Sequence, residues 1–157
     1  MIKLIDILEN QILAPEKSVR GNIDLENSSI TSLPNNLTKV GGHINLANSK
    51  ITSLPDNLEV GVYLDLRNTP ITSLPDNLKV GGYLGLTNTP ITSLPDNLKV
   101  GGDLSLYKTL ITSLPNNLEV GADLYLYNTP LSKKYSVEEI KKMIEDKGGE
   151  VKGKIYI

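Results

Sequence analysis

The sequence lacks cysteine, tryptophan and phenylalanine, and it contains a single histidine. Without cysteine there is no disulfide framework, no thiolate metal site and no cysteine nucleophile. Without phenylalanine and tryptophan, apolar burial must rest on Leu, Ile and Val. The formal net charge is −2, and the basic residues are scattered rather than gathered in the stripe that sequence-independent nucleic-acid binding requires. We therefore expect no nucleic-acid partner.

A long apolar run is also missing from the first residues. Lys3, Asp6 and Glu9 interrupt residues 1–13, so we expect neither a secretory signal nor a membrane span there. The expected location is the cytoplasm, without a membrane partner. Residues 2–13 fit a short amphipathic helix or, because Ile5-Asp6-Ile7 resembles a strand motif, a degenerate coil; the helix is the preferred interpretation.

What the sequence does have is a 20-residue repeat. Residues 71–90 read ITSLPDNLKVGGYLGLTNTP, and the units 51–70, 91–110 and 111–130 repeat them with few changes. The unit 30–50 carries one extra residue near Thr38, and a half unit, 21–29, precedes it. A period of this length is typical of a solenoid. We predict one domain over residues 1–157, with an N-terminal cap (1–20), repeats (21–131) and a C-terminal cap (132–157).

Each repeat contains one clear strand signal. Leu84 and Leu86 alternate with polar or small residues, which places both leucines on one face of an extended segment. We predict a parallel β-solenoid with one strand per 20-residue coil. The return segment supplies further core columns such as Ile71, Leu74 and Leu78, while Pro75 excludes a regular helix. The convex side should therefore consist mostly of turns and extended or 3-10 pieces.

Polar residues recur where each strand ends. A column of hydroxyl side chains is predicted to satisfy backbone groups as the chain leaves the sheet. It comprises Ser28, Ser49, Thr69, Thr89, Thr109 and Thr129, and an Asn column broken by Lys108 runs beside it.

Solenoids require caps, because their last coil would otherwise expose the core. Ser136-Val137-Glu138-Glu139 is a capping box, so residues 136–147 are predicted to form a helix over the last coil. Residues 151–157 resemble the repeat closely enough to form a final strand. Lys152 and Lys154 would oppose edge-to-edge pairing by their charge, and we expect a monomer in the unbound state.

The repeat resembles a known family. The string LDLRNTPITSLP at 64–75 is similar to the 20-residue leucine-rich repeats of bacterial effectors of the YopM and IpaH type. It is still more similar to the Val-Gly-Gly-x-Leu-x-Leu tandem repeats of bacterial and phage proteins. The resemblance covers about residues 20–131 and implies a leucine-rich-repeat fold. Ser or Thr stands where such repeats usually have Asn, and Gly61, Gly81 and Gly101 replace the first Leu of the strand motif. The ligase domain of some effectors needs a catalytic cysteine, so that activity is not carried over.

No set of residues suggests catalysis. An enzyme needs unlike polar groups that converge on one point. His43 lies at an exposed strand position, where a solvated histidine is the simpler interpretation. Asp56, Asp76 and Asp96 form a convex column with the oxygen ligands that calcium prefers, but their Pro-x-Asn context explains them as turn residues. We predict a non-enzymatic protein without metal or cofactor.

The outward strand positions vary from coil to coil, whereas the convex Thr-Ser-Leu-Pro face is nearly constant. The candidate binding residues on the sheet face are Tyr63, Asp65, Arg67, Tyr83, Asp103, Tyr107, Asp123, Tyr125 and Tyr127. We expect the rings of Tyr107, Tyr125 and Tyr127 to form one aromatic patch, joined by Tyr156 if the last strand forms. Tyrosine is enriched at binding hot spots. The alternative is that stacked tyrosines only stabilise neighbouring strands.

These features predict a protein-binding repeat module. The expected partner is a protein, and the resemblance to phage repeats suggests an inhibitor or adaptor that acts on a bacterial protein in the producing or infected cell. The alternative is a passive structural component of a virion or an oligomer.

Overall fold

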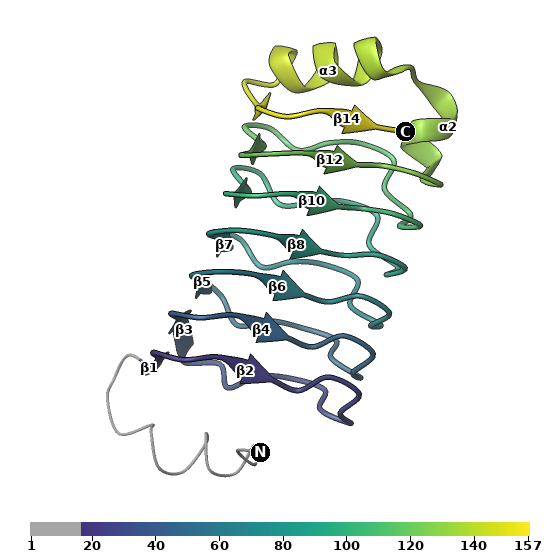
Figure 1. Ribbon diagram of the computed structural model, residues 1–157. Coiled ribbons are helices and arrows are strands. Elements are labelled where there is room, and N and C mark those ends of the chain that lie inside the picture. Colours follow the sequence, from purple (N-terminus) through teal and green to yellow (C-terminus); the bar gives the residue numbers. More distant parts are fainter. Residues whose placement is uncertain (1–16) are drawn as a thin grey trace.

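The computed structural model describes residues 17–157, which form a parallel β-solenoid (Figure 1). Stacked coils of about 20 residues make its body, and two helices cover its C-terminal end. The predicted helix or degenerate coil over residues 2–13 lies outside the described residues. No helix among the described residues is long and apolar enough to cross a membrane.

Two parallel sheets of seven strands each run along the solenoid. Sheet A contains β1 (Lys17–Val19), β3 (Leu37–Val40), β5 (Glu59–Val60), β7 (Lys79–Val80), β9 (Lys99–Val100), β11 (Glu119–Val120) and β13 (Glu150–Val151). Sheet B contains β2 (Ile23–Asp24), β4 (Ile44–Asn45), β6 (Leu64–Asp65), β8 (Leu84–Gly85), β10 (Leu104–Ser105), β12 (Leu124–Tyr125) and β14 (Ile155–Tyr156). Equivalent residues of successive coils pair directly, as Leu84 does with Leu104.

The prediction of one strand per coil was wrong, because each coil contributes one strand to each sheet. The second strand is the dipeptide directly before the glycine pair of the repeat, for example Lys79–Val80 before Gly81-Gly82. Two residues are too few to show an alternating pattern, so Val80 resembled one more core position of the return segment. The third side of each coil, which carries the Thr-Ser-Leu-Pro segment, consists of extended pieces and turns, as predicted.

The predicted core columns are confirmed. In one coil Ile71, Leu74, Leu78 and Val80 point inward from the third side and sheet A, and Leu84 and Leu86 do so from sheet B. All six are buried, and the same columns recur in the coils on either side. Burial of one such side chain contributes roughly 1.5–3 kcal/mol, and only the stacked neighbours make that burial possible.

The corner between the two sheets requires glycine because successive coils approach each other closely there. A Cβ on Gly101 would lie 2.1 Å from the carbonyl oxygen of Gly81, and one on Gly81 would lie 2.2 Å from that of Gly61. Glycine provides the space required at this first corner position in the coils that carry Gly41, Gly61, Gly81, Gly101 and Gly121, whereas the terminal coil has Lys152 there. The second position is less restricted, since Val62 and Ala122 occupy it in two coils.

The extra residue near Thr38 is absorbed in sheet A. Strand β3 is four residues long, and its pairing with β1 shifts register between Lys17 and Ser18. Ser18 pairs with Lys39, so that the residue between Leu37 and Lys39 is skipped and the next coils resume their regular register. The insertion therefore leaves sheet B undisturbed.

The C-terminal cap is close to the prediction. Helix α3 (Val137–Asp146) begins after the Ser136 capping box, and its Ile140 and Ile144 are buried over the last coil. The final strand is confirmed, because β14 pairs with β12. A shorter helix, α2 (Pro130–Lys134), was not predicted; Thr129 accepts a hydrogen bond from the Ser132 amide at its start.

Candidate functional site

The candidate site is the outward face of sheet B together with the residue just before each strand and the second residue after it, called here the sheet B face. Its three columns carry the residues that vary from coil to coil. The first contains Asn22, His43, Tyr63, Tyr83, Asp103, Asp123 and Lys154; the second Asp24, Asn45, Asp65, Gly85, Ser105, Tyr125 and Tyr156; the third Glu26, Ala47, Arg67, Thr87, Tyr107 and Tyr127. Six of the seven tyrosines of the chain lie on this face.

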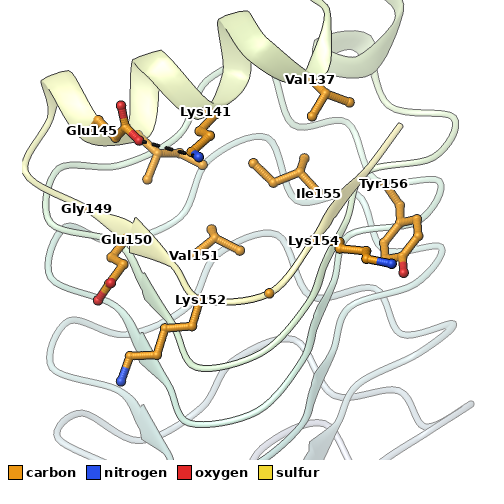
Figure 2. Close-up of a pocket in the computed structure, with 12 residues that line it drawn as sticks. Val137, Lys141, Glu145, Gly149, Glu150, Val151, Lys152, Lys154, Ile155 and Tyr156 are labelled. Carbon is orange, nitrogen blue, oxygen red and sulfur yellow. Dashed lines mark ion pairs between the residues drawn. The ribbon is translucent and has the colours of Figure 1, made fainter.

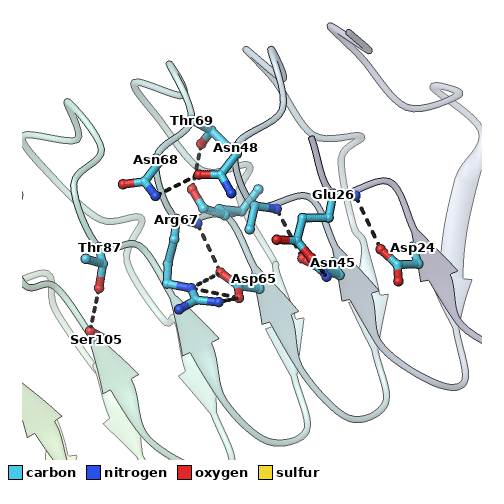
Figure 3. Close-up of polar contacts among 12 residues, drawn as sticks. Asp24, Glu26, Asn45, Asn48, Asp65, Arg67, Asn68, Thr69, Thr87 and Ser105 are labelled. Carbon is cyan, nitrogen blue, oxygen red and sulfur yellow. Dashed lines mark hydrogen bonds and ion pairs between the residues drawn. The ribbon is translucent and has the colours of Figure 1, made fainter. Parts of the chain in front are cut away.

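In the N-terminal half of the face, charged side chains satisfy one another. Arg67 forms a bidentate pair with Asp65, with Nη2 2.7 Å and Nε 2.8 Å from Oδ2, and Asp65 is only 6% exposed beneath it (Figure 3). The hydrogen bond and charge of Asp65 raise the pKa of Arg67. Asp65 Oδ1 also accepts the Arg67 backbone amide. Asp65 and Arg67, both candidate binding residues, therefore bind each other.

The tyrosines of this half are also engaged locally. The ring of Tyr63 stacks on His43, with centroids 4.3 Å apart and planes inclined by 5°. Tyr83 lies across Gly85, because a Cβ on Gly85 would be 2.6 Å from the Tyr83 hydroxyl oxygen. Burial raises the pKa of Tyr83, and the nearby Asp65 carboxylate raises it further. Tyr83 thus fills the space that Gly85 leaves open on the sheet.

Asp103 and Asp123 connect neighbouring coils just after the glycine corner, where each carboxylate accepts a backbone amide. Asp103 Oδ1 accepts the backbone amide of Asp123 at 2.9 Å, and Asp123 Oδ1 accepts that of Lys154 at 2.7 Å. Asn22 does the same for the amide of His43 at 3.1 Å. Each side chain supplies an acceptor to the amide of the next coil. One oxygen of each aspartate is therefore committed to the fold.

The C-terminal end of the face is different, because its aromatic rings gather near the surface. Tyr125 stacks on Tyr156 with centroids 4.9 Å apart, and Tyr127 is tilted against Tyr156 at 6.2 Å. Tyr127 is 40% exposed. Partial burial raises the pKa of Tyr125, with smaller contributions from Asp103 and Asp123. We call Tyr125, Tyr127 and Tyr156 the aromatic end.

Tyr107 does not stack within the aromatic end, although we expected one patch with Tyr125 and Tyr127. Its ring instead contacts the Lys108 ammonium, which lies 5.1 Å from the ring centroid. Within residues 17–157 its ring makes no stacked pair. The aromatic end is therefore formed by Tyr156 with the two tyrosines of the preceding coil.

The asparagine columns have a backbone role that we did not predict, because they adopt positive φ angles. Asn27, Asn48, Asn68, Asn88 and Asn128 all have φ near +57°, and so does Lys108. A second set on the other turn, Asn57, Asn77, Asn97 and Asn117, also has positive φ. Asparagine adopts this left-handed conformation more readily than other residues with a side chain. The recurrence of Asn at a fixed place after each strand was the signal for it.

The hydroxyl column lies inside the same turn. The Oγ1 atoms of Thr69, Thr89, Thr109 and Thr129 donate to the carbonyl three residues earlier at 2.7–2.8 Å, and all four residues are buried. The serines differ: Ser49 Oγ accepts the Ile51 amide at 3.5 Å. The buried Ser28 hydroxyl has no partner among the described residues. The bonds of the threonines remain within one coil.

A groove of about 530 Å³ lies between α3 and the last coil (Figure 2). Val137, Val151 and Ile155 form its apolar wall, and charged side chains stand around it. Figure 2 shows these pointing to different sides, with Lys141 4.0 Å from Glu145. The polar groups do not converge on one point, as a reaction centre requires. Within residues 17–157 no three His, Asp or Glu side chains lie where they could hold one metal ion.

Comparisons with known proteins do not assign the chain to a family. No protein-family profile, no curated protein and no solved structure matches it. The function must therefore be argued from the geometry of the sheet B face.

Proposed function

We propose that this protein is a non-catalytic binding module that holds another protein against its sheet B face. The observation that carries the proposal is the aromatic end, where Tyr125, Tyr127 and Tyr156 gather on the outside of the sheet. The aliphatic core is complete without these rings. Tyrosine offers a large rigid surface and a hydroxyl group, and it is enriched at protein-binding hot spots.

The chemistry of the face supports a protein partner over a small molecule. Small ligands usually bind in concave, mostly apolar pockets. The aromatic end is a surface of stacked rings, bordered by Asp123 and the exposed Lys154. An apolar centre with a polar margin is the usual composition of a protein interface.

We further propose that the coils are leucine-rich repeats of the bacterial and phage type. The 20-residue period, the paired leucines of sheet B and the turn that follows them support this relationship. By that relationship the protein is an inhibitor or adaptor, acting on a bacterial protein in the cytoplasm of the producing or infected cell. We propose a monomer in the unbound state, because the exposed Lys152 and Lys154 flank the terminal strands and oppose edge pairing.

The test is affinity capture from bacterial lysate followed by titration of the captured partner. Replacing Tyr125 and Tyr127 with Ala should weaken binding by about 2 kcal/mol, roughly thirtyfold, for each true hot spot. The fold should persist, because neither ring is part of the core.

The control is Thr72→Ala with Thr92→Ala, two exposed residues of the third side. If the threonine pair loses binding and the tyrosine pair binds normally, the binding surface is the third side and the proposal names the wrong face. Recovery of self-associated protein without a stoichiometric partner would favour the alternative, a structural component of a virion or an oligomer.

A further inference from the structure

The turn after β10 departs from the repeat at two positions. Lys108 stands where the other described turns of this kind have Asn, and it keeps the same left-handed conformation at φ +57°. The short asparagine side chain relieves that conformation by local hydrogen bonds, which lysine cannot reproduce. Lysine at this position therefore places strain in the backbone, and the cation–π contact of its ammonium with Tyr107 replaces the side-chain hydrogen bond of an asparagine.

In the preceding coils the asparagines at this position are joined by side-chain hydrogen bonds, which Lys108 does not continue. Asn88 donates to the Asn68 side chain at 2.9 Å, and Asn68 donates to that of Asn48 at 2.8 Å. This ladder ends at Lys108. Departures from such local rules are expected mainly at functional sites.

Leu110 is the second departure. It is 51% exposed, and it occupies the position of Pro70, Pro90 and Pro130 in other coils. Its backbone amide donates to the carbonyl oxygen of Ile91 at 3.0 Å, a bond that any residue except proline can make. The fold thus explains the amide of Leu110 but not its exposed isobutyl group.

Lys108 and Leu110 are two residues apart where the chain leaves sheet B. The Lys108 ammonium lies over the Tyr107 ring, and the Lys108 amide donates to the Tyr127 carbonyl oxygen at 3.0 Å, which places the exposed Tyr127 beside it in the next coil. We call Tyr107, Lys108, Leu110 and Tyr127 the turn patch.

The charge around the turn patch is positive. Helix α2 follows the next turn on the same side of the solenoid (Figure 1) and exposes Lys133 and Lys134. Neither these lysines nor Lys108 form an ion pair with any residue from 17 to 157. Asp103 and Asp123, the acidic residues of these two coils on the sheet B face, each commit an oxygen to a backbone amide.

We propose that the turn patch binds an acidic segment of the protein partner, in which a carboxylate meets Lys108 and a neighbouring apolar side chain packs between Leu110 and Tyr127. Charge complementarity selects the carboxylate, and the exposed leucine and tyrosine select the apolar residue. The inference rests on the proposed function and specifies the partner chemistry at this end of the sheet B face.

The experiment selects peptides from a random library displayed on phage, with the full-length protein immobilised. Enriched peptides should carry Asp or Glu next to a large apolar residue. In fluorescence-polarisation titrations with these peptides, Lys108→Asn and Leu110→Ser should each weaken binding at least about tenfold. Leu110→Ser retains the amide that bonds to Ile91. The matched control is Lys50→Ser, which removes an exposed lysine from the position of Leu110 in an earlier coil.

A thermal melt separates loss of binding from loss of fold. Lys108→Asn restores the residue that suits the left-handed conformation, so its midpoint should rise by about 2–4 °C while peptide binding falls. A lower midpoint would overturn the strain argument. Enrichment of peptides without acidic residues, equal binding by Lys108→Asn and Leu110→Ser, or no enrichment at all would overturn the proposal.

The tyrosine variants distinguish this inference from the proposed function. If Tyr125→Ala and Tyr127→Ala weaken binding of the captured partner while Lys108→Asn and Leu110→Ser do not, the aromatic end binds the partner but Lys108 and Leu110 make no contribution, and the further inference is wrong. If all four variants bind normally, both proposals are wrong.

Discussion

Sheet A and sheet B enclose the same core, yet their outward faces differ in kind. Sheet A presents one charged residue per coil through most of its length, and these pair across coils, as Lys79 does with Glu59 at 2.8 Å and Lys99 with Glu119 at 2.7 Å. Sheet B presents aromatic, acidic, small and basic side chains in no fixed order. The regular column of sheet A is explained by pairing between coils, whereas the varied residues of sheet B follow no such rule and agree with the proposed binding role.

Removing the C-terminal cap should have the largest effect, because it affects both sheets at once. Deletion of residues 132–157 removes β13, β14 and α3 and exposes the last core layer. That layer contains Ile111, Leu114, Leu118, Leu124 and Leu126. An apolar layer beside open strand edges favours aggregation. Light scattering should show oligomers or larger particles, and the melting temperature should fall. A truncated protein that is monomeric and melts like the full chain would show that the cap is dispensable.

A substitution at the corner that joins the two sheets should have the second-largest effect on stability. Gly101→Ala places a methyl group against the Gly81 carbonyl oxygen, 2.1 Å away, and the coils must separate to accommodate it. We expect a loss of about 2–3 kcal/mol in the free energy of unfolding, measured by urea denaturation. Gly102→Ala is the matched control, since the equivalent position is Ala122 in the next coil and Val62 two coils earlier. Equal losses in both variants would contradict the close-approach explanation.

The smallest effect should come from the charged column of sheet A. The hydrogen bond and charge of Lys79 lower the pKa of Glu59. A lowered folded-state pKa means that the contribution of Glu59 to stability is present above the pKa of an unfolded glutamate and is lost as the pH falls through the folded value. Lys79→Ala should therefore reduce stability slightly at neutral pH and low salt, and not at acid pH or high salt.

Thermal melts at several pH values and salt concentrations would measure this dependence. A loss that stays the same at acid pH would rule out the ion pair as its cause. A large loss at neutral pH would mean that the outward column of sheet A does more than keep the protein in solution.

The period and the core columns could be predicted from the sequence because they repeat. Leu84 and Leu86 alternate visibly, and the capping box at Ser136 marks the start of α3. Sheet A was missed because a dipeptide such as Lys79–Val80 shows no alternation. Helix α2 was missed although Thr129-Pro130 is a favourable helix start, because the same Thr-Pro pair begins extended segments in earlier coils.

The candidate site was less accessible from the sequence. The alternation correctly placed Asp65 and Arg67 on the same side of a strand, and two such residues can reach each other, so their pairing could have been foreseen. The stacking of Tyr125 on Tyr156 rather than with Tyr107 depends on side-chain torsions that no column pattern encodes. The strain at Lys108 became meaningful only when its backbone angle was known.

The concentration of tyrosine on the sheet B face also has an optical consequence. The chain has no tryptophan, so tyrosine is its only strongly emitting residue, and six of its seven tyrosines lie on that face while Tyr135 lies between the two helices. The intrinsic ultraviolet emission of the unlabelled protein therefore reports mainly on one surface. Contact at that surface changes the surroundings of the emitting rings, whereas rearrangement of the aliphatic core is nearly silent.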